Sequence, residues 1–105
     1  MTREIRPVTP GEILDEEWLK PLQISQYALA KALSVPPRRI NEIVKGKRAI
    51  TADTAVRLAA YFDTDVQSWI NLQTQYDAAL AREKIGEQAL LEIRRLGIQS
   101  DAKGE

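Results

Sequence analysis

The segment SQYALAKALSVPPRRINEIV, residues 25–44, predicts two short helices joined by a tight turn. Ser25 is a favourable N-cap for the first helix, residues 26–33, because its hydroxyl can accept a backbone N–H of the first turn. Pro37 suits the first position of the second helix, since its φ is already helical and its missing N–H is not needed there. Two helices with so short a connection have the geometry of a helix-turn-helix.

Apolar residues recur at helical spacing in both helices and predict their buried faces. The predicted buried residues are Ala28, Leu29, Ala32, Leu33, Ile40, Ile43 and Val44. The outward residues of the second helix are then Pro37, Arg38, Arg39, Asn41, Glu42 and Lys45. A recognition helix meets the base edges of the major groove with its N-terminal residues, and here that end carries two adjacent arginines.

Helix signals continue on both sides of this segment. Thr9 and Glu12 form a capping box that opens a helix, and Pro21 predicts the end of that helix. Thr51 is a further N-cap, and a second capping box beginning at Thr64 opens a longer helix.

Glycines mark the later boundaries. Gly46 supplies a left-handed C-terminal cap for the second helix of the motif. Gly86 would cost about 1 kcal/mol inside a helix, so a kink or break is predicted there. Residues 87–96 predict a last helix closed by Gly97, and residues 98–105 a disordered tail. With no strand alternation, the chain predicts an all-α fold, a compact bundle of five to six helices.

Composition limits the possible functions. A chain of 105 residues is long enough for one domain with a single core. Cysteine and histidine are both absent, which excludes disulfides and removes the commonest metal ligand and the usual base near neutral pH. We therefore predict no catalytic residue, metal or cofactor. No membrane-spanning stretch is present, and residues 1–6 lack the apolar core of a signal peptide, so we expect a cytoplasmic protein.

Charge is concentrated in one part of the chain. The formal net charge is zero, yet residues 31–48 carry six basic side chains against one acidic side chain. The remaining residues are net acidic. A local basic segment in a neutral protein is the footprint expected for nucleic acid, although charge alone fits a solvated basic loop equally well.

The outward face of the second helix offers base-contacting groups. Either arginine can bond bidentately to guanine, and Asn41 can read adenine. Glu42 can accept from cytosine or orient a neighbouring arginine. The predicted base-contacting residues are Pro37, Arg38, Arg39, Asn41 and Glu42. A surface arginine pair is otherwise only a solvated face, and Asn41 can be a local cap.

Phosphate contacts are predicted at both ends of the motif. The start of the first helix can hold a phosphate through its backbone amide and polar side chains. Cations after the second helix can neutralise the DNA backbone. The predicted phosphate-contacting residues are Ser25, Gln26, Lys45, Lys47 and Arg48.

Aromatic and apolar residues beyond the motif have several interpretations. Phe62, Trp69 and Tyr76 at helical spacing favour core positions over a base-stacking platform or a dimer interface. A C-terminal apolar stripe consists of Ile85, Ala89, Leu90, Ile93 and Leu96. It can pack on the core, pair with a second protomer or contact a partner, and the sequence does not choose.

Several ordered motifs carry a resemblance. They are TPGEIL at 9–14, LKPL at 19–22, SQ at 25–26, RINEIVKGKR at 39–48, ITADTA at 50–55, WINLQ at 69–73 and YD at 76–77. In this order they resemble the HigA-type (VapI-like) antitoxins of the xenobiotic-response-element (XRE) helix-turn-helix superfamily, over residues 7–83. The helix-turn-helix part alone would fit many repressors.

The resemblance implies a lambda-repressor-like fold and a homodimer that binds a palindromic operator in its own promoter. It also implies a partner, a small RelE-like (HigB-type) toxin that cleaves mRNA on the ribosome. We expect residues 1–83 to form the DNA-binding domain and residues 84–97 an extension for packing, dimer or partner contact. Ser34 and Asp63 stand where the family usually has glycine, at a cost of about 1 kcal/mol if φ is positive there.

Other functions remain open at this point. A stand-alone repressor without a toxin is the nearest alternative, and a neighbouring gene for a small basic protein would favour the antitoxin. A protein-interaction module on the same fold is a second alternative, against which Arg38 and Arg39 argue. An enzyme has the least support.

Overall fold

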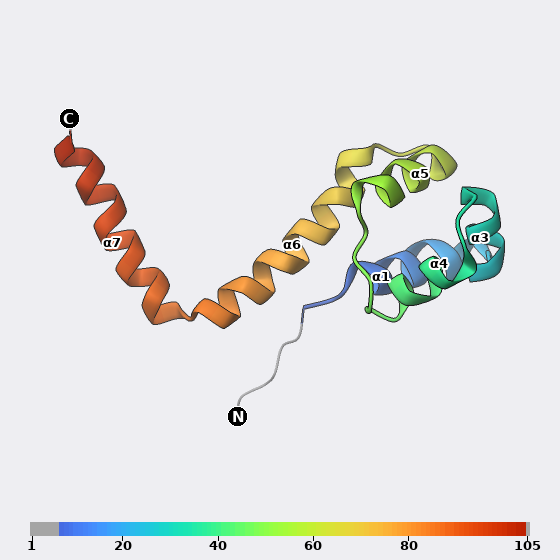
Figure 1. The fold of residues 1–105 in the computed structure, drawn as a ribbon, viewed down its shortest axis with the longest axis horizontal. Coiled ribbons are helices and arrows are strands. Elements are labelled where there is room, and N and C mark those ends of the chain that lie inside the picture. The colour runs from blue at the N-terminus through green and yellow to red at the C-terminus, as the bar shows by residue number, and fades with distance from the viewer. Residues whose placement is uncertain (1–6, 105) are drawn as a thin grey trace, which may run out of the picture.

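The computed structural model describes the backbone of residues 7–104 and side chains as far as residue 97. Within these residues every regular element is helical, so the all-α prediction is confirmed (Figure 1). The elements are α1 (Pro10–Ile13), the π-helical η1 (Leu14–Leu19), α2 (Lys20–Leu22), α3 (Gln26–Leu33), α4 (Pro37–Val44), α5 (Ala52–Phe62), α6 (Val66–Ile85) and α7 (Glu87–Gly104).

The core lies between the first helical rod (α1, η1 and α2) and α3, α4 and α5. Leu14, Leu29, Ile40 and Leu58 are completely buried, one from each of η1, α3, α4 and α5. Each of these helices therefore buries its apolar face and exposes its polar face, as expected of amphipathic helices that pack on a single core.

The first rod does not end at Pro21, and the prediction that it stops there is wrong. It opens with the predicted capping box at Thr9 and runs on through α2 to the left-handed residue Gln23, which has φ 56°. In η1 the bonds reach five residues back, as from the Lys20 N–H to the Asp15 carbonyl. This wider turn relieves the clash that a proline ring makes with the carbonyl four residues back in a regular α-helix.

The buried stripe of α3 is displaced from its predicted position. Leu29, Ala30 and Leu33 are buried, whereas Ala28 and Ala32 are exposed. A helix of two turns has too few apolar residues to define the centre of its face, and α3 packs on both α4 and α5. Those two neighbours together turn Ala30 inward.

The N-cap of α6 is Asp65, so the predicted capping box at Thr64 is wrong. The two carboxylate oxygens of Asp65 accept the backbone N–H of Ser68 at 3.1 Å and its hydroxyl at 2.6 Å. These bonds hold the pKa of Asp65 below its usual value. The Thr64 hydroxyl instead accepts the indole N–H of Trp69 at 2.7 Å.

Aromatic rings close the core near the start of α6. The ring centroid of Trp18 lies 4.7 Å from that of Phe62 and 5.4 Å from that of Trp69. Trp69 is buried, Phe62 packs on the core, and Tyr76 is partly buried further along α6. The predicted core positions are therefore confirmed for Phe62 and Trp69, whereas Tyr76 is not among the residues of the core.

The chain breaks at Gly86, as predicted, where φ is 93°. The next helix continues through Gly97 to Gly104, so the predicted end at Gly97 is wrong. Glycine disfavours a helix interior without forbidding it, and φ at this glycine is not positive. Helical backbone thus replaces the expected tail up to residue 104, and Glu105 lies outside the described residues.

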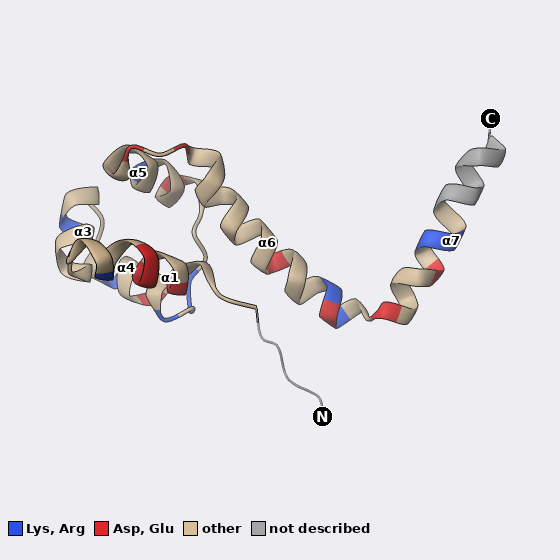
Figure 2. Ribbon diagram, turned by 180° about the vertical axis from the view of Figure 1, so that it is seen from behind, with Lys and Arg blue, Asp and Glu red and all other residues tan. Residues whose placement is uncertain are grey.

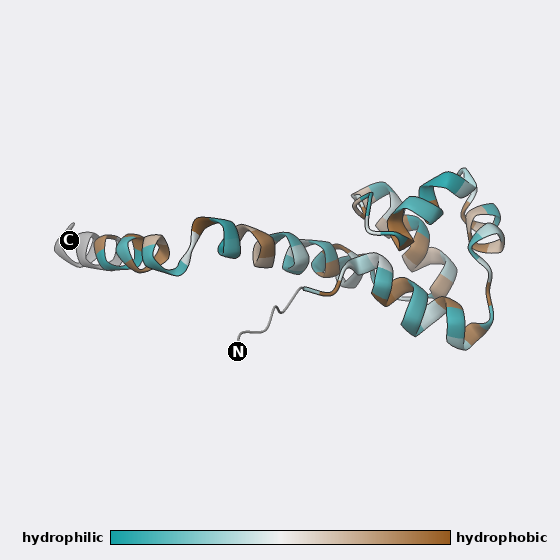
Figure 3. Cartoon of the chain, turned by 90° about the horizontal axis from the view of Figure 1, so that it is seen from below, coloured by the Kyte–Doolittle hydropathy of each residue, from teal (hydrophilic) through white to brown (hydrophobic). Residues whose placement is uncertain are grey.

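The second half of α6 and all of α7 form an extension that we call the C-terminal arm (Figure 1). The radius of gyration is 18.1 Å, against about 13 Å for a compact domain of this size. Apolar bands continue along the arm, and Ile85, Ile93 and Leu96 are at least half exposed (Figure 3). These three residues of the C-terminal stripe therefore do not pack on the core in this structure. Among the described helices, none is long and apolar enough to cross a membrane.

Candidate DNA-binding surface

The apolar side of α4 is seated on the core, so its polar side faces solvent. Ile40 and Ile43 are 0% and 1% exposed, and Val44 packs against the core beside them. From behind, α1 comes so close that a Cβ on Gly11 would lie 1.7 Å from the Ile43 carbonyl oxygen. The orientation of α4 is thus set by backbone contact as well as by side-chain packing.

The turn between α3 and α4 depends on a left-handed residue. Ser34 has φ 60°, and the following N–H, from Val35, donates to the Ala30 carbonyl at 3.0 Å. Val35 itself is buried and anchors the turn. Pro37 then takes the first helical position of α4, as predicted, and is exposed. The turn therefore holds the start of α4 at the surface.

Two arginines hold the carboxylate of Glu42 on the exposed face of α4. The Arg38 Nε donates to one oxygen at 3.1 Å, and the Arg48 guanidinium donates to the other at 2.9 Å. These ion pairs, led by the hydrogen bond from Arg48, keep the pKa of Glu42 below its usual range. Each oxygen of Glu42 thus has an arginine partner, which fits the predicted role of orienting a neighbouring arginine.

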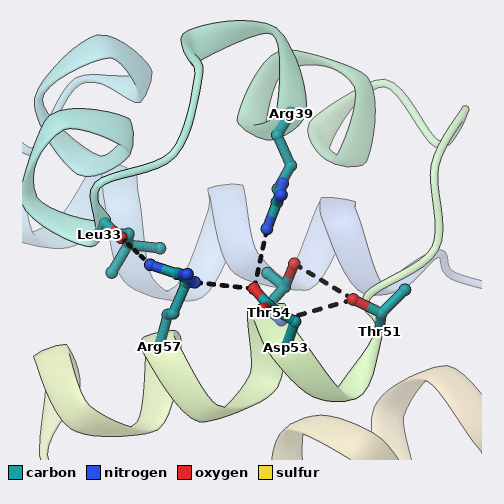
Figure 4. Close-up of polar contacts among 6 residues, drawn as sticks. All are labelled: Leu33, Arg39, Thr51, Asp53, Thr54 and Arg57. Carbon is teal, nitrogen blue, oxygen red and sulfur yellow. Dashed lines mark hydrogen bonds and ion pairs between the residues drawn. The ribbon is translucent and has the colours of Figure 1, made fainter.

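Arg39 has a different partner from its neighbour. Its Nη1 donates to Oδ1 of Asp53 on α5 at 3.0 Å, and the same oxygen accepts Nε of Arg57 at 2.7 Å. Arg57 also donates to the Leu33 carbonyl at 2.8 Å, at the end of α3 (Figure 4). The hydrogen bonds from Arg57 and then Arg39 lower the pKa of Asp53. The Arg38 side chain is 79% exposed, against 27% for that of Arg39.

Asn41 joins the two helices of the motif. Its Nδ2 donates to Oε1 of Gln26 at the start of α3. The side chain of Asn41 therefore bonds to another helix and does not act as a local cap in this structure. A second amide hydrogen and the carbonyl oxygen of Asn41 stay available in this arrangement for a base edge.

The predicted phosphate-contacting residues lie at the two ends of the motif. Ser25 caps α3, and its Oγ accepts the Ala28 N–H at 3.0 Å. Lys45, Lys47 and Arg48 are exposed directly after α4, where Figure 2 shows basic residues on the helix and the following loop. The structure brings Gln26 to Asn41 and Arg48 to Glu42, so the two predicted sets share one surface.

Sequence reasoning missed two charged residues of this surface. Asp53 and Arg57 lie four residues apart on α5, which is a spacing for a helical ion pair that the sequence does display. Their contact with Arg39, across the helix-turn-helix, has no such local signal. A further missed contact is made by Gln73 on α6, which accepts the Ile50 N–H at 2.8 Å and fastens the loop between α4 and α5.

Comparison with known proteins places this geometry in a family. A family model described as helix-turn-helix matches residues 16–69, which include α3 and α4. Virulence-associated protein I of Dichelobacter nodosus is 59% identical over 80 residues, 76% of this chain and 74% of that protein. Antitoxin HigA-1 of Vibrio cholerae is 34% identical over 84 residues, 80% of this chain and 79% of that protein. The chain belongs to the HigA-type helix-turn-helix family.

Solved structures agree with this membership. The Pseudomonas aeruginosa antitoxin HigA, in a structure with the higBA promoter, has a TM-score of 0.75 and 49% sequence identity, covering 79% of this chain and 90% of that one. The resemblance to HigA-type antitoxins and the helix-turn-helix fold are thus confirmed. The prediction that the chain is not an enzyme agrees with its place in this family of DNA-binding regulators.

Proposed function

We propose that this HigA-type chain binds a palindromic operator as a homodimer and represses its own operon. The observation that carries the proposal is the placement of α4, whose apolar side is buried on α1 and the core while its start is exposed. The Pseudomonas aeruginosa relative is a complex with promoter DNA, and its sequence is 49% identical. Binding to an operator would place the protein's work in the cytoplasm.

In this proposal α4 lies in the major groove. Its base-contacting residues are Pro37, Arg38, Arg39, Asn41 and Glu42, with Glu42 acting through the arginines that it orients. The phosphate contacts come from Ser25, Gln26, Lys45, Lys47 and Arg48. A twofold dimer would present two such helices to half-sites about 34 Å apart. In the proposal residues 1–83 are the DNA-binding domain, and residues 84–97 of the arm are an extension for packing, dimer or partner contact.

The second part of the proposal is neutralisation of a RelE-like, HigB-type toxin. It is supported by the family and by the net acidic charge outside residues 31–48, which suits a basic RNA-cleaving partner. A stand-alone repressor is the alternative. The test begins with a search beside the gene for a reading frame that encodes a small basic protein. Where one is found, the two proteins are co-expressed and analysed by size-exclusion chromatography. A stable complex supports the antitoxin, and its absence supports the stand-alone repressor.

DNA binding is tested by fluorescence anisotropy at several salt concentrations. One duplex carries the sequence upstream of the gene, and the other is its scrambled counterpart. We expect the upstream duplex to bind about a thousandfold more tightly. The double variant Arg38→Ala/Arg39→Ala should lose this preference.

The chain offers a matched control in Arg94→Ala/Arg95→Ala, another adjacent arginine pair, on α7. Size-exclusion chromatography first checks that this variant elutes as the wild type does, because the arm is proposed for dimer contact. With assembly unchanged, it removes the same charge outside α4 and should keep the preference. Equal and weak binding of both duplexes by the wild type and by the α4 variant would refute recognition through this helix.

A further inference from the structure

A carboxylate from α5 lies beside Arg39 of α4, the helix proposed to enter the major groove. Asp53 is 57% exposed, and its Oδ1 lies 3.0 Å from Nη1 of Arg39 (Figure 4). A surface carboxylate so close to a recognition helix would repel DNA phosphates if it were unpaired. Asp53 thus places a negative charge beside residues that are predicted to contact DNA, where it would weaken binding unless a cation pairs with it.

The position of Asp53 is fixed from a second side. Arg57 donates to the same carboxylate oxygen at 2.7 Å and to the Leu33 carbonyl at 2.8 Å. This bond to the last residue of α3 holds Arg57, which in turn holds Asp53. The carboxylate is thus tied to the end of α3 through Arg57 and lies within hydrogen-bond distance of Arg39.

Pairing with Asp53 changes what Arg39 can offer to DNA. A single cation gains affinity for any sequence by neutralising a phosphate and releasing counterions. An arginine already neutralised by a carboxylate gains little of this non-specific affinity. Its guanidinium has five N–H donors, so donors beyond the one given to Asp53 stay available for a bidentate contact with guanine.

We infer that Asp53 is a specificity-determining residue, which positions Arg39 for a base edge and withholds its charge from the phosphates of other sequences. This inference rests on the proposed function. Glu42 pairs with Arg38 within α4, whereas Asp53 acts from another helix and so ties the arginine to the fold of the motif.

The test is Asp53→Asn, which keeps the size of the side chain and removes its charge. Anisotropy is measured on the upstream and scrambled duplexes across a salt series. We expect tighter binding of the scrambled duplex and a salt slope steeper by about one. The preference for the upstream duplex should fall about tenfold, as for one weakened base contact. Glu17→Gln makes the same charge change on η1, beside the start of α6, and is expected to alter neither quantity.

Asp53→Glu keeps a carboxylate at this position and should keep the salt slope of the wild type. Thermal unfolding of each variant separates a structural role, because a merely destabilised protein would bind both duplexes less tightly with an unchanged slope. That pattern, or a slope equal to that of Glu17→Gln, overturns the inference while leaving the proposed function intact. A wild type without preference for the upstream duplex refutes both.

Discussion

Replacing Gly11 with alanine should push α4 away from α1. The added Cβ would lie 1.7 Å from the carbonyl oxygen of Ile43, 2.6 Å from its carbonyl carbon and 2.9 Å from Cα of Val44. Favourable contact begins at about 3.5 Å, so the two helices must separate by about 1.5–2 Å. All three atoms belong to the backbone, and no side-chain rotation can relieve the clash.

The cost follows from that separation. Overpacking a core costs about 1–3 kcal/mol, and a clash with backbone belongs at the upper end of this range. Alanine recovers at most about 1 kcal/mol through its higher helix propensity. We therefore expect the free energy of unfolding to fall by about 2 kcal/mol, which lowers Tm by about 8–16 °C in a domain of this size.

Thermal unfolding followed by circular dichroism at 222 nm measures this change. Gly97→Ala is the matched control, since Gly97 lies within α7 and a Cβ there meets no atom within 4 Å. Its Tm should equal or exceed that of the wild type. A Gly11→Ala variant as stable as the Gly97→Ala variant would refute the close contact between α1 and α4.

Three further predictions concern the helix ends. Ser34→Gly should raise the free energy of unfolding by up to about 1 kcal/mol, because Ser34 has a positive φ. Asp63→Gly should raise it by less, because aspartate tolerates a positive φ better than serine does. Urea titrations that show a lower free energy of unfolding for both variants would contradict the strain argument. Thr64→Val removes the acceptor of the Trp69 indole N–H, and the unpaired buried donor should cost about 1–3 kcal/mol in the same titration, whereas no loss would mean that the bond contributes nothing net. Hydrogen bonds from Ser68 in the first turn of α6 hold the pKa of Asp65 in the folded protein below its usual 3.8. The stability that Asp65 contributes is therefore complete above pH 3.8 and is lost as the pH falls through the folded pKa. Asp65→Asn should lose this part of the pH dependence, and identical pH dependence of stability in the wild type and the variant would contradict the prediction.

Helix boundaries were predictable where the signal is local. The N-cap hydrogen bonds of Ser25 and Thr51 each join residues of a single helical turn. The left-handed conformation of Gly46 likewise depends on that one residue. A few consecutive residues of the sequence are therefore enough to predict each of these features. Predictions failed where the local signal competes with a contact that only the folded structure shows. Thr64 lost the capping role to Asp65 because its hydroxyl is taken by Trp69.

Pro21 and Gly97 show a second kind of failure. Each is a residue that disfavours a helix interior, and in the sequence each predicts a helix end. The π-helical turn before Pro21 removes the clash at the level of the backbone, and the propensity cost of Gly97 is too small to stop a helix by itself. Such local preferences are weak compared with the cooperativity of a long helix.

The amino-acid sequence by itself determined the all-α class, the two helices of the motif, the basic segment and the family. These depend on spacing, composition and capping, which are properties of neighbouring residues. Only the tertiary structure decided which charges pair, as in Arg39 with Asp53 and Glu42 with Arg48. It also decided that Gly11 seats α4 and that the C-terminal arm leaves the core. The reason is physical, because contacts between helices depend on their rotation and distance, and these are set by the packing of the whole core rather than by any single segment.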